Sequence, residues 1–224
     1  AERLKAEGAD ILDVGGESTR PFSQGVSAAD ELARVSEVVQ RLALETSVPI
    51  SIDTSKAAVA ARAIELGAEI INDVTGLEGD PAMLAVARDT GAGVCAMHMQ
   101  GTPQTMQVDP RYGDVITEIH DYLRQRRDAL VDAGIPLEKI CLDPGIGFGK
   151  THAHNLTLMA HARKGFLGKI IEQKLGRPAT EDDRDAATAG AACGLAADGI
   201  QLVRVHAVGM VRTALEAFAA TRGT

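Results

Sequence analysis

Hydroxyl and guanidinium side chains follow a short apolar run near the start of the chain. Residues 11–14 read Ile-Leu-Asp-Val, and the next seven residues include Thr19, Arg20 and Pro21. The apolar run suits a strand that is covered on both faces of a parallel sheet, and the glycines and proline after it end that strand. Thr and Arg donors at the carboxyl edge of a sheet are typical of an anion-binding site.

Five later apolar runs end in polar residues in the same way. The runs and their polar ends are 49–52 with Asp53, 69–71 with Asn72 and Asp73, 94–97 with His98, 139–142 with Asp143, and 200–208 with Arg204 and His206. Because the carboxyl ends of parallel strands meet at one edge of a sheet, these side chains are predicted to form a single site.

Helical patterns alternate with these strands. The first predicted helix begins after Ser27, which is its N-cap. The later ones cover 56–66, 82–89, 114–133, 182–198 and 211–220. This alternation predicts right-handed βαβ units and an α/β fold with a parallel sheet. The polar stretch 100–112 breaks the rhythm and is predicted to be a long, mobile loop at the functional edge.

Composition limits the class of protein. A chain of 224 residues with 45% apolar residues is interpreted as one domain covering 1–224. The net charge of −8 argues against a nucleic-acid partner, and no apolar segment approaches the roughly 20 residues of a membrane span. The odd number of widely spaced cysteines, three in all, favours free thiols in a reducing cytoplasm.

The strand count falls short of a closed barrel. Residues 1–9 resemble the end of a helix that closes at Gly8, and no strand-like run separates the helix at 151–160 from residues 161–168. Six runs are present, whereas a (β/α)₈ barrel needs eight. We expect the first strand with its loop and the seventh strand to be missing, with a break at Ala162–Arg163 wider than the ~3.8 Å of a trans peptide.

Seven motifs in order resemble those of the dihydropteroate synthase family, the folate-pathway target of sulfonamides. They are Asp13–Pro21, Ser51–Thr54, Ile71–Val74, Met97–Gly101, Asp143–Lys150, Arg163–Gly168 and Arg204–His206. Each motif alone is weak, but the ordered set covers almost the whole chain and is very specific.

The resemblance implies a (β/α)₈ TIM barrel that acts as a transferase. The implied reaction condenses 6-hydroxymethyl-7,8-dihydropterin pyrophosphate with 4-aminobenzoate, giving 7,8-dihydropteroate and pyrophosphate. It also implies a homodimer and Mg²⁺ on the pyrophosphate, held partly by an Asn of the first loop. That loop is absent from this sequence, so no metal ligand is assigned.

The pterin-binding residues implied by the resemblance are Asp53, Asn72, Met97, Asp143 and Lys164. A pterin ring presents an edge of adjacent donors, and one carboxylate can accept two of them. Asp143 suits this role, because a glycine-rich loop rather than a helix follows it and a helix cap is therefore the weaker interpretation. Met97 offers a polarizable floor to the ring.

Arg204 and His206 resemble the family's pyrophosphate-binding residues and, with Lys164, are the predicted catalytic groups. They lie two apart on one predicted strand and so on one face, although His206 could instead be a core histidine. The predicted pyrophosphate and aminobenzoate contacts are Thr19, Arg20, Pro21, Phe148, Arg204 and His206. No covalent nucleophile is needed, because the aryl amine attacks as pyrophosphate leaves.

Two positions depart from the family pattern, and two other functions stay open. Ala207 stands where the family often has Asp, and Ala162 stands where it often has Ser.

A pterin-binding methyltransferase that donates to a corrinoid shares the Asp, Asn and Asp lining, whereas the motifs at 163–168 and 204–206 favour the synthase. A non-catalytic pterin-binding module is the third possibility.

Overall fold

The computed structural model describes residues 1–161, 180–197 and 200–222. It divides into two compact units, residues 10–151 and residues 1–9 with 152–224. Each unit is described by itself below. The single domain over 1–224 stays a prediction, and the expected break at Ala162–Arg163 lies outside the described residues.

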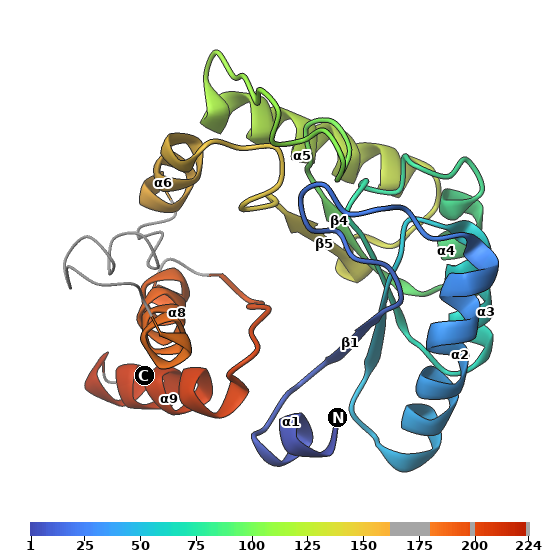
Figure 1. Ribbon diagram of the computed structural model, residues 1–224, viewed down its shortest axis with the longest axis horizontal. Coiled ribbons are helices and arrows are strands. Elements are labelled where there is room, and N and C mark those ends of the chain that lie inside the picture. Colours follow the sequence, from blue (N-terminus) through green and yellow to red (C-terminus); the bar gives the residue numbers. More distant parts are fainter. Residues whose placement is uncertain (162–179, 198–199, 223–224) are drawn as a thin grey trace. The chain divides into compact units, whose positions relative to one another are not determined.

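The larger unit is built on a five-stranded parallel sheet (Figure 1). Its strands are β1 (Leu12–Gly15), β2 (Ile50–Asp53), β3 (Ile70–Asp73), β4 (Gly93–Met97) and β5 (Ile140–Asp143). They pair in the order β1-β2-β3-β4-β5, which follows the chain without a reversal. A doubly wound sheet reverses its order at one point, whereas a (β/α)₈ barrel does not. All five strands were predicted from the apolar runs.

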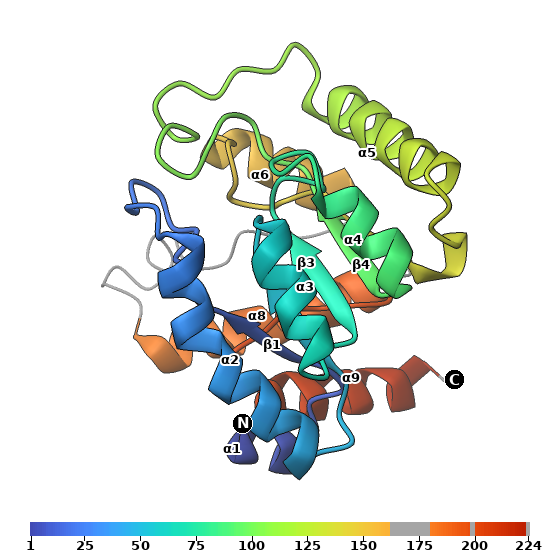
Figure 2. The same ribbon diagram turned by 90° about the vertical axis from the view of Figure 1, so that its right-hand side faces the viewer.

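Helices cover one face of this sheet. They are α2 (Ala28–Glu45), α3 (Ala57–Glu65), α4 (Met83–Thr90) and α5 (Val115–Asp132), followed by the 3₁₀ turn η1 (Leu137–Lys139). Figure 2 shows α2, α3 and α4 side by side in front of the strands. The buried apolar layer between them includes Leu12, Val35, Val39, Ile52, Val59, Ile71, Met83 and Val94. This layer fixes which side of each strand faces the helices.

The start of α2 follows from its capping residue. The Ser27 backbone is extended, and its side-chain oxygen accepts a hydrogen bond from the Asp30 amide at 3.1 Å. The Ser27 hydroxyl also donates to the Asp30 carboxylate at 2.6 Å. This arrangement satisfies one of the amides that a helix start leaves without an intrahelical partner. The predicted N-cap is confirmed.

The smaller unit is helical in its described residues. It contains α1 (Glu2–Ala6), α6 (His152–His161), α8 (Glu181–Ala197) and α9 (Val208–Arg222). Ala189 and Ala192 of α8 pack against Val211 of α9. The end of α1 joins α9, because the Arg212 guanidinium donates to the Gly8 carbonyl at 2.7 Å.

The predicted strand at 200–208 is wrong. Residues 200–207 have no regular structure, and α9 begins at Val208. Val203 and Val205 pack against the α8–α9 core, so the alternating apolar pattern reflects packing on helices. A strand also needs a hydrogen-bonded neighbour, and within the described ranges the sheet contains only β1 to β5.

No helix within the described residues is long and apolar enough to cross a membrane.

Replacing the cap tests this account of α2. Ser27→Ala is expected to lower the free energy of unfolding by about 1 kcal/mol, because the Asp30 amide loses its acceptor. Urea denaturation measures the change. Ser36→Ala is the matched control, since the Ser36 hydroxyl donates to the Leu32 carbonyl inside α2 and caps nothing. Equal losses in both variants would contradict the capping role.

Candidate active site

Four predicted pterin-binding residues share one face and one edge of the sheet. Asp53 at the end of β2 pairs in register with Asn72 of β3, and Met97 of β4 pairs with Asp143 of β5. Asn72 is also the partner of Cys95, two residues before Met97. Neighbouring strands lie roughly 4.8 Å apart, and paired residues project to the same side. The structure therefore brings these side chains together on the face opposite the helices.

Asp13 of β1 joins this group, although sequence reasoning did not include it in the site. The Asn72 amide donates to an Asp13 carboxylate oxygen at 3.4 Å. The sequence predicted that the strand containing Asp13 is covered on both faces, whereas the structure exposes the Asp13 side chain. The available signal was its position in the first motif, two residues before the glycine pair.

Asp73, the neighbour of Asn72, points the other way. Its side chain is fully buried and accepts hydrogen bonds from the Thr75 amide and hydroxyl, both at 2.8 Å, and from the Leu77 amide at 3.2 Å. Burial raises the pKa of this carboxyl, against the effect of these donors. Asp73 thus holds the loop after β3, and only Asn72 faces the site.

The glycine-rich loop after β5 lies directly on the backbone at the end of β4. Gly145 has φ of +66°, and a Cβ at this position would lie 2.0 Å from the His98 carbonyl oxygen. Gly149 has φ of +62°, and its Cβ would lie 2.5 Å from the Gln100 carbonyl oxygen. No other residue fits both requirements. The loop also orients the carboxylate before it, because the Gly145 amide donates to Asp143 at 2.7 Å.

Lys150 holds this loop from inside and was missed by sequence reasoning. Its side chain is 2% exposed, and its Nζ lies 2.8 Å from the carbonyl oxygens of both Gly145 and Phe148. The same Nζ lies 3.3 Å from the His98 carbonyl oxygen and 3.1 Å from His98 Nδ1. One amine therefore joins the end of β4 to the loop after β5. The signal was a lysine directly after a glycine-rich loop.

Burial shifts the pKa of both members of this contact. It lowers the pKa of Lys150 to about 7, against the opposite effect of the Asp143 carboxylate. It also lowers the pKa of His98 to about 4, and the positive charge of Lys150 adds to that shift. His98 is therefore neutral at pH 7. Its ring also packs edge to face with that of Tyr122, with the ring centroids 4.8 Å apart, so His98 has a packing role.

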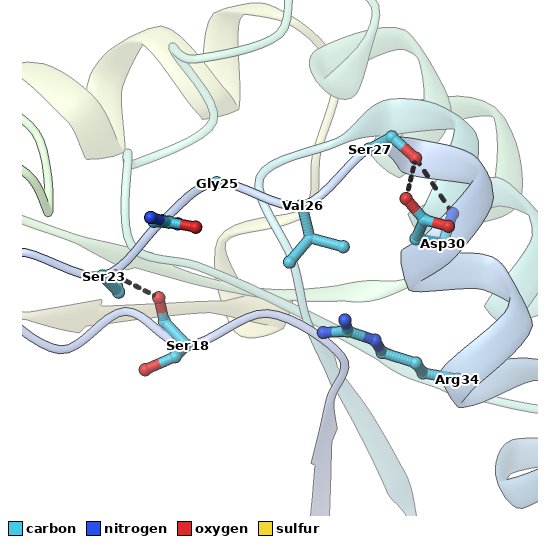
Figure 3. Close-up of a pocket in the computed structure, with 8 residues that line it drawn as sticks. Ser18, Ser23, Gly25, Val26, Ser27, Asp30 and Arg34 are labelled. Carbon is cyan, nitrogen blue, oxygen red and sulfur yellow. Dashed lines mark hydrogen bonds between the residues drawn. The ribbon is translucent and has the colours of Figure 1, made fainter.

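The loop from β1 to α2 carries Thr19, Arg20 and Pro21. Ser18, Ser23 and Val26 of the same loop are drawn in Figure 3. Beside this loop lies a hollow of about 390 Å³. The hollow is lined by Ser18, Ser23, Gln24, Gly25, Val26, Ser27, Asp30 and Arg34. Because none of the three predicted contacts lines it, we do not assign the hollow to the aminobenzoate.

Hydrogen bonds join three loops at this edge of the sheet. The Phe22 amide, in the loop after β1, donates to the Pro103 carbonyl, in the loop at 100–112, at 3.1 Å. Gln107, also in the loop at 100–112, donates to the carbonyl of Gly147 at 2.6 Å. Gly147 directly precedes Phe148 in the loop after β5. The loops that carry Pro21 and Phe148 are thus connected through the loop at 100–112. The loop at 100–112 was predicted to lie at the functional edge, and its contacts with the loops after β1 and β5 place it at that edge of the sheet.

The remaining predicted residues are not in this unit. Arg204 and His206 are both exposed and lie in the irregular segment before α9, in the smaller unit. Val203 and Val205 pack on the helices there, so alternation still places Arg204 and His206 on one side. Lys164 lies outside the described residues. In the described ranges, no three His, Cys, Asp or Glu side chains gather closely enough to hold a metal ion.

Comparison with known proteins identifies the family. The sequence profile of the family described as "Pterin binding enzyme" matches residues 1–206. The chain belongs to the pterin-binding enzyme family, and within it to the dihydropteroate synthases. It is 42% identical to the dihydropteroate synthase of Neisseria meningitidis serogroup C over 232 aligned positions, which cover 98% of this chain and 82% of that protein.

Solved structures of this family confirm the fold. The Yersinia pestis dihydropteroate synthase with a sulfonamide drug has a TM-score of 0.89 and 39% identity, covering 100% of this chain and 84% of that one. The Burkholderia cenocepacia enzyme complexed with 7,8-dihydropteroate has a TM-score of 0.84 and 42% identity, covering 99% and 85%. The expected (β/α)₈ barrel is thus confirmed, and β1 to β5 are consecutive strands of it.

The buried amine of Lys150 predicts a pH-dependent stability. The unfolded chain holds this proton up to about pH 10.5, whereas the pKa in the folded protein is about 7. Unfolding therefore takes up a proton between these values, and stability rises with pH. We expect the wild type to gain about 2 kcal/mol more than Lys150→Met between pH 7 and 9 in urea denaturation.

The exposed Lys139 supplies the matched control for that experiment. Lys139→Met is expected to keep the wild-type dependence on pH. A Lys150→Met variant with the same gain as the wild type would contradict a depressed pKa for the buried amine.

Proposed function

We propose that this chain condenses 6-hydroxymethyl-7,8-dihydropterin pyrophosphate with 4-aminobenzoate, forming 7,8-dihydropteroate and pyrophosphate. Two findings support the proposal. Its relatives are named dihydropteroate synthases, and one of them is solved with 7,8-dihydropteroate. The observation that carries it for this chain is the gathering of Asp53, Asn72 and Asp143 at one edge of the sheet.

Asp143 binds the donor edge of the pterin in this proposal. Its carboxylate already accepts the Gly145 amide through one oxygen, which fixes the plane of the group. Two oxygens provide roughly four lone-pair positions, so the carboxylate can still accept two adjacent ring donors. Asp53 and Asn72 complete the polar lining, and Met97 lies beside Asp143 as an apolar contact for the ring face.

The chemical step is a displacement at the pterin methylene carbon. The aminobenzoate nitrogen donates its electron pair to form the new C–N bond, and the C–O bond breaks with its electrons going to pyrophosphate. The nitrogen then releases a proton to solvent. Negative charge develops on the leaving group, so cationic donors aimed at it lower the barrier. Arg204, His206 and Lys164 are the proposed donors.

The loops after β1 and β5 bind the aminobenzoate in this proposal. Thr19 and Arg20 supply donors for its carboxylate, whereas Pro21 and Phe148 flank the ring. The hydrogen bonds that connect both loops to residues 100–112 support a shared role. A donor pair for a carboxylate next to two flat apolar groups matches the chemistry of this substrate.

Mg²⁺ is part of the proposal as the counterion of pyrophosphate. The described residues do not offer three His, Cys, Asp or Glu side chains to one ion, so they do not fit a metal site made by protein alone. Mg²⁺ commonly keeps several waters and takes its other ligands from substrate phosphates. In this proposal the ion would therefore be held by the diphosphate and water, and none of the described side chains is assigned to it.

The proposal also covers location and assembly. The free thiols of Cys95 and Cys141, which are register partners on β4 and β5, support a reducing cytoplasm. Leu202, before α9, and Met210, in α9, have exposed apolar side chains, which support a homodimer. The names of the relatives favour a synthase over a corrinoid methyltransferase.

Replacing Asp143 tests the pterin contact. Asp143→Asn is expected to lower kcat/KM by about 100-fold, because charge-assisted hydrogen bonds to the ring are weakened. The assay is pyrophosphate release that depends on 4-aminobenzoate. Asp89→Asn on the exposed side of α4 is the control, since Asp89 forms a surface ion pair with its neighbour Arg88 at 2.7 Å. A wild type without release would favour the non-catalytic module.

Removing Mg²⁺ separates turnover from pterin binding. With EDTA, pyrophosphate release is expected to fall at least about tenfold, because the leaving group loses its counterion. Calorimetry should show unchanged affinity for 6-hydroxymethylpterin, which carries no diphosphate. Restoring Mg²⁺ should restore release, and turnover that resists EDTA would contradict the role of the ion.

A further inference from the structure

Three charged side chains meet at the base of the loop after β1, and we call them the Lys56 cluster. Lys56 Nζ donates to Glu31 Oε2 at 2.6 Å and also donates to Glu17 Oε2. Glu17 belongs to the loop after β1, Glu31 to α2, and Lys56 directly precedes α3. The cluster therefore joins three segments within the larger unit.

The cluster is not an exposed surface ion pair. The Glu31 side chain is fully buried, and those of Glu17 and Lys56 are 23% and 25% exposed. Burial acts to lower the pKa of Lys56, but the two carboxylates outweigh it and the pKa is raised. Lys56 therefore stays protonated throughout the physiological range. Removing one member of such a group leaves charge without its partner, which is costly.

Glu17 also closes the loop on itself. Its second oxygen, Oε1, accepts a hydrogen bond from the Val26 amide at 3.0 Å. One carboxylate thus ties residue 17 to residue 26 and ties both to Lys56. The base of the loop is held again by Arg34, which donates to the Gly16 carbonyl at 2.8 Å.

The segment that this carboxylate encloses carries the proposed aminobenzoate contacts. Thr19, Arg20 and Pro21 lie between Glu17 and Val26 in the chain. We propose that Glu17 is a positioning residue, which sets the conformation of this loop through Lys56 and the Val26 amide and so sets the affinity for the aryl amine. This inference rests on the proposed function. Pterin binding, which uses the strand ends, does not depend on it.

Glu17 is the member of the cluster that can be changed with least risk to the fold. Lys56→Met would leave the buried Glu31 without a cation and is expected to destabilise the protein. Without Glu17, by contrast, the contact between Lys56 and Glu31 remains and its charges balance. Glu17→Gln is the conservative variant, because its amide oxygen can still accept the Val26 amide.

The experiment compares Glu17→Ala, Glu17→Gln and the wild type. Glu17→Ala is expected to raise KM for 4-aminobenzoate about tenfold while changing KM for the pterin substrate less than about twofold. Hydrogen exchange at the Val26 amide should accelerate at least about tenfold, because its acceptor is gone. Glu17→Gln should recover most of both effects. Glu65→Ala is the matched control, since Glu65 pairs with Arg62 at 2.9 Å on the exposed side of α3.

Each outcome decides one claim. Equal rises in both KM values, or an unchanged KM for 4-aminobenzoate with faster Val26 exchange, would overturn the positioning role and leave the proposed function standing. A wild type without pyrophosphate release that depends on 4-aminobenzoate would overturn both. A selective rise with recovery in Glu17→Gln supports the inference.

Discussion

In-register pairing of the parallel strands is the constraint on which the site depends. Side chains alternate between the two faces of a strand, so a shift of one residue would move every polar group to the helix side. The register that pairs Asp53 with Asn72 and Met97 with Asp143 keeps these groups together. It also sends the neighbouring Asp73 into the interior, where it accepts hydrogen bonds from Thr75 and Leu77. The buried layer of Ile52, Ile71 and Val94 maintains this register.

Two lysines fix the loops that extend from this frame, and they do so by different chemistry. Lys150 is surrounded by backbone carbonyl oxygens and an imidazole, so burial dominates and its pKa falls to about 7. Lys56 faces two carboxylates, which keep its charge despite partial burial. In both cases one amine joins segments that are far apart in the chain. A lysine suits this role because its flexible stem carries three donors at one point.

The sequence-based prediction succeeded where local patterns and tertiary packing agree. The five strands at 12–15, 50–53, 70–73, 93–97 and 140–143 each coincide with a short apolar run that was predicted to be a strand. The run at 200–208 showed the same pattern and was wrong. There Val203 and Val205 pack on α8 and α9, so alternation alone could not distinguish a strand from an extended segment on helices. Asp13 was misjudged for a related reason, because composition does not show which face of a strand is covered.

The sequence by itself determined the order of strands and helices, the polar residues at the strand ends and the family, because these depend on local patterns and ordered motifs. Tertiary structure alone decided which of two adjacent polar residues faces the site, and it revealed Lys150 and the Lys56 cluster. The partners of these lysines lie 52 residues away at His98, and 39 and 25 residues away at Glu17 and Glu31. No local pattern encodes such contacts, because they exist only after the sheet has brought the loops to one edge.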